Sequence, residues 1–439
     1  MKTFKLGGVH PSGNKLSAGS QIQTSALPTE AIIPLSQHIG APAKPIVAKG
    51  DKVKVGQLIA EASSFMSANI HSSVSGTVSK IEDTIDVTGY KRPAIYITVE
   101  GDEWDESIIQ KKELLNNCTL SAADIIAKIK DMGIVGMGGA TFPTHVKLNV
   151  PTDKKIDTLI VNGVECEPFL TADHRLMLEH GAEIVLGCKI LMKALNVQQT
   201  YIGIESNKPD AIENLSSIAS NHLGIEVVPL KMKYPQGGEK QLIEAIVGRK
   251  VQSGKLPADV GVVVQNIGTV FAVYEAVQKN KPLIERVITV TGEVKKPSNF
   301  LVRIGTPMAQ LVEQAGGYNN NVGKIVAGGP MMGRAIVNDK IPVTKGSSGL
   351  LIISEDKAER GEEKDCIRCS KCVSACPMGL EPYLLSTLVE LKNWEKAAQL
   401  HIMDCIECGC CTFSCPANRP LIDLLKFGKF SLRKQSTKK

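Results

Sequence analysis

The chain has 439 residues, 43% of them hydrophobic, so it is long enough for about three domains that each bury a core. Its net charge of +6 is modest, and no basic stripe carries interleaved aromatic residues, so nucleic-acid binding is disfavoured. It has no run of about 18 apolar residues and no apolar signal core near Met1, so we expect neither a membrane span nor secretion. A reducing cytoplasm suits the eight cysteines that are interpreted below as thiolate ligands.

Residues 1–105 are predicted to form a small β domain, because short apolar stretches alternate there with Gly, Pro and charged turns. The stretch 47–61 is similar to one half of the barrel-sandwich domains that carry lipoyl or biotinyl groups, and 70–78 is similar to the other half. Such carriers attach their cofactor to a lysine in the hairpin between the halves, but 65–69 contains none. A structural or docking role is therefore favoured over a carrier role.

A helix is predicted from Leu120 to Met132, with Ser121 as its N-cap and Gly133 at its end. The glycine-rich loop 136–143 comes next. This loop follows a helix and lacks a Gly-Lys-Ser or Gly-Lys-Thr ending, so it fits neither a dinucleotide fingerprint nor a Walker loop. A phosphate cradle and a sharp structural turn both remain open, because glycines serve either purpose.

From residue 156 to about 280 strand and helix patterns alternate, which predicts an α/β layer with a largely parallel sheet. Strands are expected at 158–161, 200–204, 226–230 and 260–264, and helices at 177–195, 210–222, 239–247 and 270–277. Ligands of such folds bind beyond the C-terminal ends of the strands. Polar residues follow each strand, including Asn162, Glu165, Glu167, Glu205, Asn207, Asn266 and Thr269. Single polar loop residues are usually solvated, but their recurrence predicts a site at this edge.

Residues 283–354 are predicted to form a small α+β unit, with strands at 286–291 and 349–353 and a helix at 307–315. A charged linker, 355–364, leads from it toward the C-terminal cysteines.

Two copies of the spacing C-x-x-C-x-x-C-x-x-x-C-P stand at 366–377 and 405–416, with a helix predicted between them at 381–400. This is the pattern of bacterial two-cluster ferredoxins, in which the fourth cysteine of each run binds the other cluster. One [4Fe-4S] cluster is then expected on Cys366, Cys369, Cys372 and Cys415, and the other on Cys405, Cys408, Cys411 and Cys376.

Other uses of these cysteines fit the spacing less well. Structural zinc takes two cysteine pairs and does not require a displaced fourth ligand, and a disulfide framework does not suit clustered cysteines in a chain without a signal peptide. Cys410 occupies no ligand position, and we interpret Cys118, Cys166 and Cys188 as small buried hydrophobes.

The tail 426–439 is basic and has no acidic residue. A frayed, solvated end is the favoured interpretation, and docking to anionic lipid or to an acidic redox partner is the alternative.

Several motifs resemble the FMN- and NADH-binding subunit of respiratory complex I: Gly136–Lys147, Asn162–Pro168, Tyr234–Glu239 and Asn266–Thr269. The segments Gly7–Pro11 and Pro34–Pro42, with the twin cysteine runs, resemble the RnfC family more closely. RnfC proteins are the NADH-side subunits of the Rnf ion-translocating ferredoxin:NAD⁺ oxidoreductase, and the resemblance covers nearly the whole chain.

The resemblance implies a multidomain α/β protein with a barrel-sandwich-like β domain (1–105), an α/β flavin-binding domain (115–282), an SLBB-like β-grasp domain (283–354) and an α-helical two-cluster ferredoxin-like domain (359–425). It implies FMN, NAD(H) and two [4Fe-4S] clusters as cofactors, with no catalytic side chain, since the cofactors carry the redox chemistry. The flavin and nucleotide residues it implies are Gly136, Gly138, Gly139, Lys147, Asn162, Glu165, Glu167, Tyr234, Gly237, Gly238, Glu239, Asn266 and Thr269.

The implied role is electron transfer between NAD(H), FMN and the clusters, within a complex that includes membrane-embedded and iron–sulfur subunits. A peripheral position on the cytoplasmic side of the plasma membrane follows. Two alternatives remain: a cobalamin reductase of the microcompartment type, and a ferredoxin-like wiring subunit with an empty flavin fold.

Overall fold

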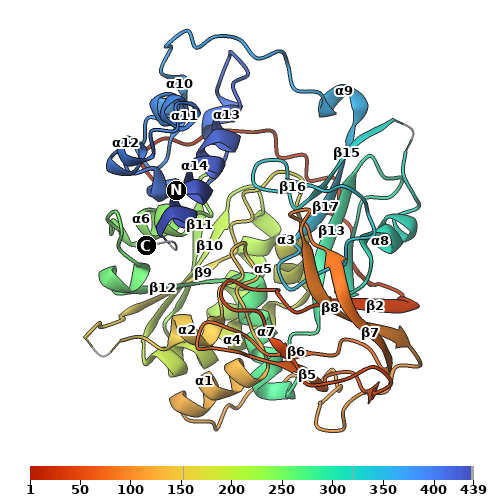
Figure 1. Ribbon diagram of the computed structural model, residues 1–439. Helices are drawn as coiled ribbons and strands as arrows, with labels where there is room; N and C mark the ends of the chain where they lie inside the picture. The colour runs from red at the N-terminus through yellow and green to blue at the C-terminus, as the bar shows by residue number, and fades with distance from the viewer. Residues whose placement is uncertain (152, 320, 437–439) are drawn as a thin grey trace.

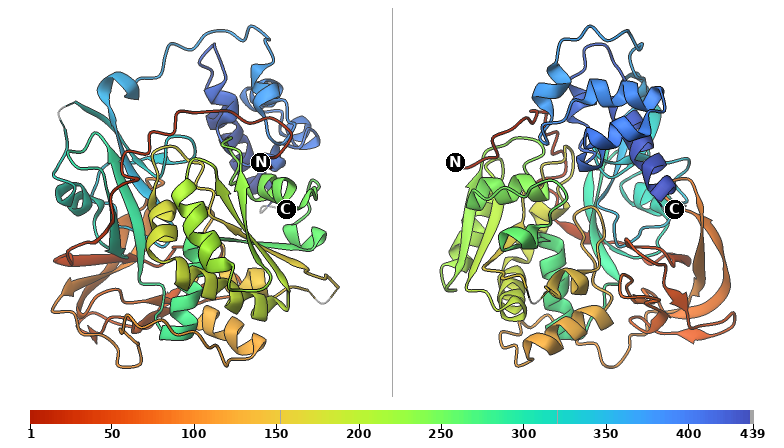
Figure 2. Two further views of the ribbon diagram at one scale, coloured as in Figure 1. Left: turned by 180° about the vertical axis from the view of Figure 1, so that it is seen from behind. Right: turned by 60° about the vertical axis from the view of Figure 1, so that its left-hand side comes forward.

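The computed structural model describes residues 1–151, 153–319 and 321–436. In Figure 1 two small β-sheets lie at the lower right, an α/β layer at the lower left, a mixed sheet at the right, and the C-terminal helices at the top. The views of Figure 2 show the N-terminal segment running between the C-terminal helices and the α/β layer before it reaches the sheets. Among the residues that the structure describes, no helix has the length and apolar character needed to span a bilayer.

Residues 30–99 form two small antiparallel sheets around one apolar core, with the strand orders β2-β8-β7-β4 and β3-β5-β6. The strands are β2 (Glu30–Pro34), β3 (Lys44–Pro45), β4 (Lys52–Val53), β5 (Leu58–Glu61), β6 (Ile70–His71), β7 (Gly76–Ile85) and β8 (Lys91–Val99). Burial alternates along the first four residues of β2, as the pleat requires, and Ile33 of β2, Ile59 of β5 and Ile95 of β8 lie in the same core. A β domain is confirmed within the predicted range, but its two sheets begin at Glu30, and the N-terminal segment pairs with other parts of the chain.

The α/β layer has a parallel sheet of order β11-β10-β9-β12, which confirms the predicted parallel sheet. Its elements are α1 (Ala122–Asp131), α2 (Thr144–Leu148), β9 (Thr158–Asn162), α3 (Ala172–Glu179), α4 (Gly181–Leu195), β10 (Gln199–Glu205), α5 (Pro209–Ala219), β11 (Ile225–Leu230), α6 (Glu239–Val247), η1 (Pro257–Val260), β12 (Val262–Asn266) and α7 (Ile267–Lys279). Leu159 and Val161 pack in the core shared with α4 and α7, whereas Ile160 packs in the core shared with α6. Ser121 caps α1 as predicted, in a capping box with Asp124.

Three helix predictions in this layer were wrong in their bounds, and the helix expected at 210–222 ends as α5 at Ala219. The helix expected at 177–195 is two helices, α3 and α4, which meet at His180. Gly181 allows close packing there, because a Cβ on it would lie 2.8 Å from Ile218 of α5. Helix α7 begins at Ile267 and not at 270, because Asn266 caps it by accepting a hydrogen bond from the Gly268 amide at 2.8 Å.

The mixed sheet has the order β1-β14-β13-β17-β15-β16, with α8 (Met308–Gln314) packed in its core. The strands are β1 (Ile22–Thr24), β13 (Glu285–Gly292), β14 (Ser298–Arg303), β15 (Val322–Ala327), β16 (Arg334–Ala335) and β17 (Gly349–Ser354). Strand β1 comes from the N-terminal segment and pairs in parallel with β14. The expected strands at 286–291 and 349–353 are confirmed, and β1, β14, β15 and β16 were not predicted.

The chain from Glu355 onward is helical, with the short helix α9 ahead of the cysteine runs. Its elements are α9 (Glu355–Ala358), α10 (Lys371–Ala375), α11 (Pro382–Glu390), α12 (Trp394–Gln399), η2 (Ile402–Asp404), α13 (Cys410–Phe413) and α14 (Leu421–Ser436). The single helix expected at 381–400 is two helices, because the chain turns at Lys392, where φ is +54°.

The predicted frayed tail was wrong over 426–436, because these residues continue helix α14. Lys429 is buried, donates to the Cys405 carbonyl at 2.6 Å and pairs with Glu407 at 2.6 Å. Lys429, which the sequence suggested to be solvated, therefore holds α14 against the segment at Cys405 and Glu407. Residues 437–439 of the predicted tail lie outside the described residues.

Candidate functional site

The carboxyl edge of the parallel sheet brings the glycine-rich loop against the start of α7. Asn162 ends β9 and Asn266 ends β12, and the two are partners across the sheet. A Cβ on Gly138 would lie 2.9 Å from the Cβ of Asn266, so this close approach requires glycine. The Met137 amide donates to the Thr269 hydroxyl at 2.9 Å. Loop 136–143 therefore packs directly on the capped N-terminus of a 13-residue helix.

Lys147 of α2 reaches the same edge from the other side. Its ammonium lies 2.7 Å from a carboxylate oxygen of Glu239 and donates to the Val264 carbonyl at 2.9 Å. The two charged side chains stay 30% and 40% exposed, so a ligand could reach both. Glu239 is the first residue of α6, where the helix dipole favours a negative charge.

Asn162 fastens the loop after β9 to the turn 234–238. Its amide nitrogen donates to the Gly237 carbonyl at 2.8 Å, and its amide oxygen accepts from the Val164 amide at 3.2 Å. The Gly237 amide in turn donates to the Cys166 sulfur at 3.4 Å. Gly238 follows as the N-cap of α6. The predicted residues after β9 and β11 are thus joined through their loops.

Both glutamates of the loop after β9 are engaged by backbone amides. The Glu165 carboxylate accepts from the amides of Asp173 and His174 at 2.7 and 3.2 Å, so it caps α3. Glu167 accepts from the amides of Met331 and Met332 at 2.6 and 3.0 Å, which ties the flavin-type loop to the mixed-sheet domain. Burial raises the pKa of Glu167 above its ordinary value.

Two residues of this region escaped the sequence-based prediction. Asp173 accepts from the Asn266 side-chain amide at 2.8 Å, and burial, with the nearby Glu165, raises its pKa to about 7. It was overlooked because the helix was expected to begin at Met177. Lys15 donates to the carbonyls of Glu165, Glu167 and Leu170 at 2.9, 2.9 and 2.6 Å. No local pattern marks Lys15, since its partners lie about 150 residues away along the chain.

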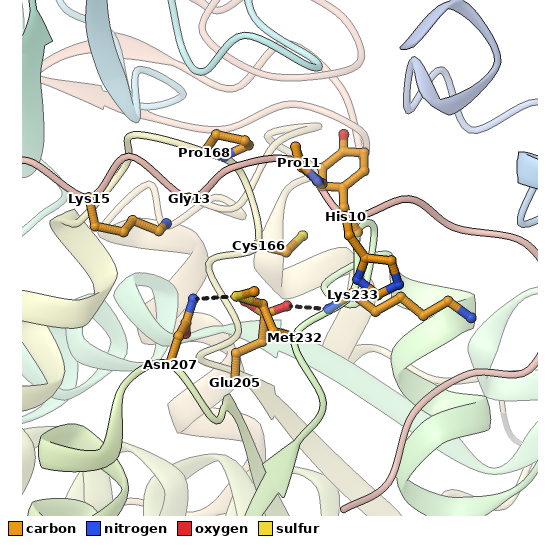
Figure 3. Close-up of a pocket in the computed structure, with 11 residues that line it drawn as sticks. His10, Pro11, Gly13, Lys15, Cys166, Pro168, Glu205, Asn207, Met232 and Lys233 are labelled. Atoms are coloured by element: carbon orange, nitrogen blue, oxygen red, sulfur yellow. Dashed lines mark hydrogen bonds between the residues drawn. The ribbon is translucent and has the colours of Figure 1, made fainter. Parts of the chain in front are cut away.

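A small pocket lies beside this edge, between the N-terminal segment and the ends of β10 and β11 (Figure 3). Its lining is His10, Pro11, Gly13, Lys15, Cys166, Pro168, Glu205, Asn207, Met232, Lys233 and Tyr234. Tyr234 is the one predicted cofactor residue among them, so this pocket and the expected flavin site are neighbours and not the same space. Gly139 lies in the open part of the glycine-rich loop, since a Cβ there would meet nothing within 4 Å.

The second cysteine run and Cys376 surround one cavity in the helical domain. The thiols of Cys376, Cys405, Cys408 and Cys411 line it, together with Cys410 and the apolar side chains of Met378, Leu380, Ile406, Ile422 and Leu425. Burial raises the pKa of the Cys405 thiol to about 11 and that of Cys411 to about 12. Ligation by iron would therefore have to displace these protons.

The first run is more open. Cys366 and Cys369 are exposed in a segment without helix or strand, whereas Cys372 is buried beside Cys415. The Lys364 amide donates to the Ala417 carbonyl at 2.9 Å, so the start of this run lies along the end of the other. Each fourth cysteine is therefore placed next to the opposite run.

The structure offers a donor set that suits iron–sulfur clusters. Within the described ranges, no three Cys, His, Asp or Glu side chains are grouped as ligands of a single metal ion. A cube distributes its thiolates over separate iron atoms, so a thiol-lined cavity with an apolar wall is the relevant comparison. Three buried thiols, those of Cys376, Cys408 and Cys411, and the half-buried thiol of Cys405 in one cavity meet that requirement for the second run.

The edge of the sheet also offers groups that fit a phosphorylated flavin. Lys147 supplies a cation, the capped start of α7 supplies a helix N-terminus, and the glycines leave the loop backbone accessible. These are the features by which proteins hold phosphate groups.

The turn 234–238 joins the two sites. The Tyr234 hydroxyl donates to the Cys408 carbonyl at 2.9 Å, and the Cys410 thiol lies 3.9 Å from the Tyr234 carbonyl. The N-terminal segment adds a further contact, because a Cβ on Gly7 would overlap the carbonyl of Cys376. Cys410, which fits no ligand position, is completely buried in this interface.

Family models match four successive parts of the chain: the RnfC barrel sandwich hybrid domain at 2–102, the Nuo51 FMN-binding domain at 129–275, the SLBB domain at 287–335 and a 4Fe-4S dicluster domain at 365–419. The predicted multidomain α/β fold class is confirmed by these matches.

Three relatives match most of the chain, and each is a subunit of a named complex. The relative from the proton-translocating ferredoxin:NAD(+) oxidoreductase complex of Clostridium ljungdahlii is 48% identical over 402 residues, which cover 91% of this chain and 87% of the relative. The relative from the Na(+)-translocating ferredoxin:NAD(+) oxidoreductase complex of Acetobacterium woodii is 44% identical, with 99% and 98% covered. The relative from the ion-translocating oxidoreductase complex of Rhodobacter capsulatus is 42% identical, with 100% and 85% covered.

Proposed function

The chain belongs to the RnfC family of subunits of ion-translocating ferredoxin:NAD(+) oxidoreductase complexes, and on that premise we propose that it passes electrons between NAD(H), FMN and two [4Fe-4S] clusters. Membership decides against the cobalamin-reductase alternative. One observation carries the proposal beyond family likeness: the cavity that holds the four predicted ligands Cys376, Cys405, Cys408 and Cys411 adjoins the flavin-type domain, because the Cys408 carbonyl accepts a hydrogen bond from Tyr234.

A bound FMN would supply the conversion between two-electron hydride exchange with nicotinamide and one-electron exchange with the clusters. In this chain Lys147 and the Asn266-capped start of α7 would hold the anionic phosphate or ring edge. Gly136, Gly138 and Gly139 would let the backbone approach the flavin.

The remaining predicted site residues would hold the loops around the flavin in position. Asn162 and Thr269 fix the loops, and Glu165 caps α3. Glu167 links the site to the mixed-sheet domain. The turn with Tyr234, Gly237, Gly238 and Glu239 would close the nicotinamide side.

The cluster assignment follows the interlocked pattern. Cys405, Cys408, Cys411 and Cys376 would hold the cube nearest the flavin, because their cavity adjoins Tyr234. Cys366, Cys369, Cys372 and Cys415 would hold the outer cube, because Cys366 and Cys369 are exposed. The exposure of these two cysteines would make this run the contact point for a redox partner.

The chain is a subunit of a multi-subunit oxidoreductase complex and, within that complex, would be the part that oxidises or reduces NAD(H). Its partners would be membrane-embedded and iron–sulfur subunits, and it would sit peripherally on the cytoplasmic side of the plasma membrane. We assign the domains 1–105, 115–282, 283–354 and 359–425, the last extended by the whole of α14.

Flavin content tests the site assignment. Lys147→Ala in the anaerobically purified full chain is expected to lower bound FMN at least about tenfold and abolish bleaching of the flavin band by NADH, since it removes a phosphate-binding cation. Lys154→Ala is the matched control, because Lys154 is also ion-paired in this domain, with Asp259 at 2.8 Å.

Iron and sulfide should stay at the wild-type level in both variants. Equal flavin content in the two variants would overturn the site assignment. Cluster absorbance with no flavin in the wild-type chain would instead favour a wiring subunit with an empty flavin fold.

A further inference from the structure

The hairpin that would carry a cofactor in a carrier domain is fixed in place in this protein. Its tip, residues 62–69, joins β5 to β6. The Ala68 amide donates to the ring Nε2 of His38 at 3.0 Å, and the Ser67 hydroxyl donates to the Ala41 carbonyl at 2.9 Å. The tip is therefore bound to its own domain, whereas a swinging carrier needs a free tip.

The same tip lies against the flavin-type domain. The ring Nε2 of His145, on α2, lies 3.2 Å from the Phe65 carbonyl, and the two rings meet edge to face at 6.1 Å. The Asn69 side-chain amide donates to the Asp131 carbonyl at the end of α1 at 3.2 Å. A neighbouring strand connection adds a bond from the Ile39 amide to the Thr141 carbonyl at 3.3 Å.

A buried lysine from the mixed-sheet domain closes this junction. Lys345 is 1% exposed, and its ammonium donates to the carbonyls of Asn69 and Gly133, both at 2.7 Å. Its backbone amide donates to the Gln37 side chain at 3.0 Å. Gly133 has φ of +63°, and a Cβ there would lie 2.2 Å from the Asn69 carbonyl oxygen. Three domains thus meet at one ammonium group with no space left over.

These contacts surround the glycine-rich loop. Gly133 lies just before loop 136–143, Thr141 lies within it, and His145 lies just after it, two residues ahead of Lys147. Within the loop the Gly136 amide donates to the Phe142 carbonyl at 2.9 Å, and the Met137 amide bonds the loop to Thr269 of α7 at 2.9 Å. The contacts at the two ends of the loop add to this hold on its position.

We propose that the hairpin tip 62–69 is a fixed clamp, locked by Lys345 and His145, that sets the position of the glycine-rich loop and of Lys147 for flavin binding. Lys345 and His145 are positioning residues, since they reach the flavin site only through other groups. This assignment rests on the flavin-binding function proposed above. It gives the barrel-sandwich domain a task for which no attachment lysine is needed.

Replacing Lys345 by methionine keeps the unbranched side chain but removes its terminal nitrogen, which leaves the carbonyls of Asn69 and Gly133 buried without a donor. A buried carbonyl without a partner recovers its hydrogen bond by moving toward water. The clamp should then loosen at both ends of the loop, and the loop amides should open more often.

The first measurement is hydrogen exchange of the loop amides of Gly136 and Met137, which donate hydrogen bonds to Phe142 and Thr269, in the full chain with its clusters. Lys345→Met should raise the exchange rates of these amides about tenfold or more. Lys324→Met is the matched control, because Lys324 lies in the same domain and also donates to a backbone carbonyl, that of Ala358 at 2.8 Å. It should leave these amides at the wild-type rate.

The second measurement is the rate of FMN release after dilution, followed by the fluorescence of free flavin. Lys345→Met and the milder His145→Gln should release flavin about tenfold faster, since the loosened loop also loosens Lys147. His222→Gln, which changes a histidine outside the junction, should not. The electron paramagnetic resonance signals of the clusters serve as the internal reference and should persist.

Faster loop exchange with faster flavin release supports the clamp. If the loop amides in 136–143 exchange at the wild-type rate in both Lys345→Met and His145→Gln, the clamp is refuted, whatever the rate of flavin release. Faster exchange with unchanged flavin release refutes the link to flavin binding. If the wild-type chain binds no FMN, the proposed flavin function fails, and the exchange measurement alone still decides whether the tip grips the loop.

Discussion

The contact between Glu167 and the loop of the mixed-sheet domain gives a sharp mutational test. A Cβ on Gly329 would lie 2.1 Å from Cγ and 2.6 Å from a carboxylate oxygen of Glu167. Gly329→Ala must therefore push this carboxylate off the amides of Met331 and Met332, from which it accepts hydrogen bonds at 2.6 and 3.0 Å. Gly329 needs no left-handed backbone, so the alanine itself adds no strain.

The magnitude follows from the two hydrogen bonds. Each bond to a carboxylate is worth about 1 to 3 kcal/mol, so losing both costs about 3 kcal/mol at this contact. That energy corresponds to roughly a 100-fold increase in the opening equilibrium. Glu167→Gln keeps the shape and one acceptor oxygen, so it should give a smaller increase, about tenfold.

The assay is amide exchange of Met331 and Met332 under conditions in which opening is fast and reversible. Gly19→Ala is the control, because a Cβ on Gly19 would meet nothing within 4 Å. If both amides exchange at the wild-type rate in Gly329→Ala, the reasoning is refuted. The overlap of the alanine Cβ with the Glu167 side chain leaves that carboxylate no position from which it can keep both hydrogen bonds.

Two further predictions concern stability and cluster ligation. Burial lowers the pKa of Lys345 from 10.5 to about 7. Between these two pH values the unfolded chain binds a proton that the folded chain lacks. The free energy of unfolding should therefore rise with pH across that window, by up to about 1.4 kcal/mol per pH unit. Thermal midpoints at pH 7.5 and 9.5 should show a rise in the wild type that is smaller in Lys345→Met, and equal rises would contradict the assignment. Cys415→Ala should remove the paramagnetic resonance signal of the cube on Cys366, Cys369 and Cys372, whereas Cys376→Ala should remove the other; the opposite pattern would disprove the interlocked pairing.

Local sequence was sufficient for the order of the modules. Alternating apolar patterns predicted the parallel sheet of β9 to β12, and Ser121 marked the start of α1. The twin cysteine spacing predicted two clusters, and the chain indeed places Cys376 in the same cavity as the second run. These features are visible in sequence because helix caps, strand alternation and ligand turns depend on residues a few positions apart.

Local sequence was insufficient where neighbours from elsewhere decide the conformation. The predicted helix at 177–195 breaks at His180, where Gly181 packs on α5. The basic tail is a helix, because Lys429 finds Glu407 and the Cys405 carbonyl across the domain. Charge and periodicity alone contain no information on such partners.

By itself, the sequence determined which cofactor-binding modules this protein has and the residues that mark them. The tertiary structure decided how those modules are joined: Tyr234 to the cluster cavity, Glu167 to the mixed-sheet loop, and Lys345 to the hairpin tip and the end of α1. The reason is physical. Each joint satisfies buried hydrogen-bonding groups with partners from 164 or more residues away, and such pairings exist only once the domains have packed.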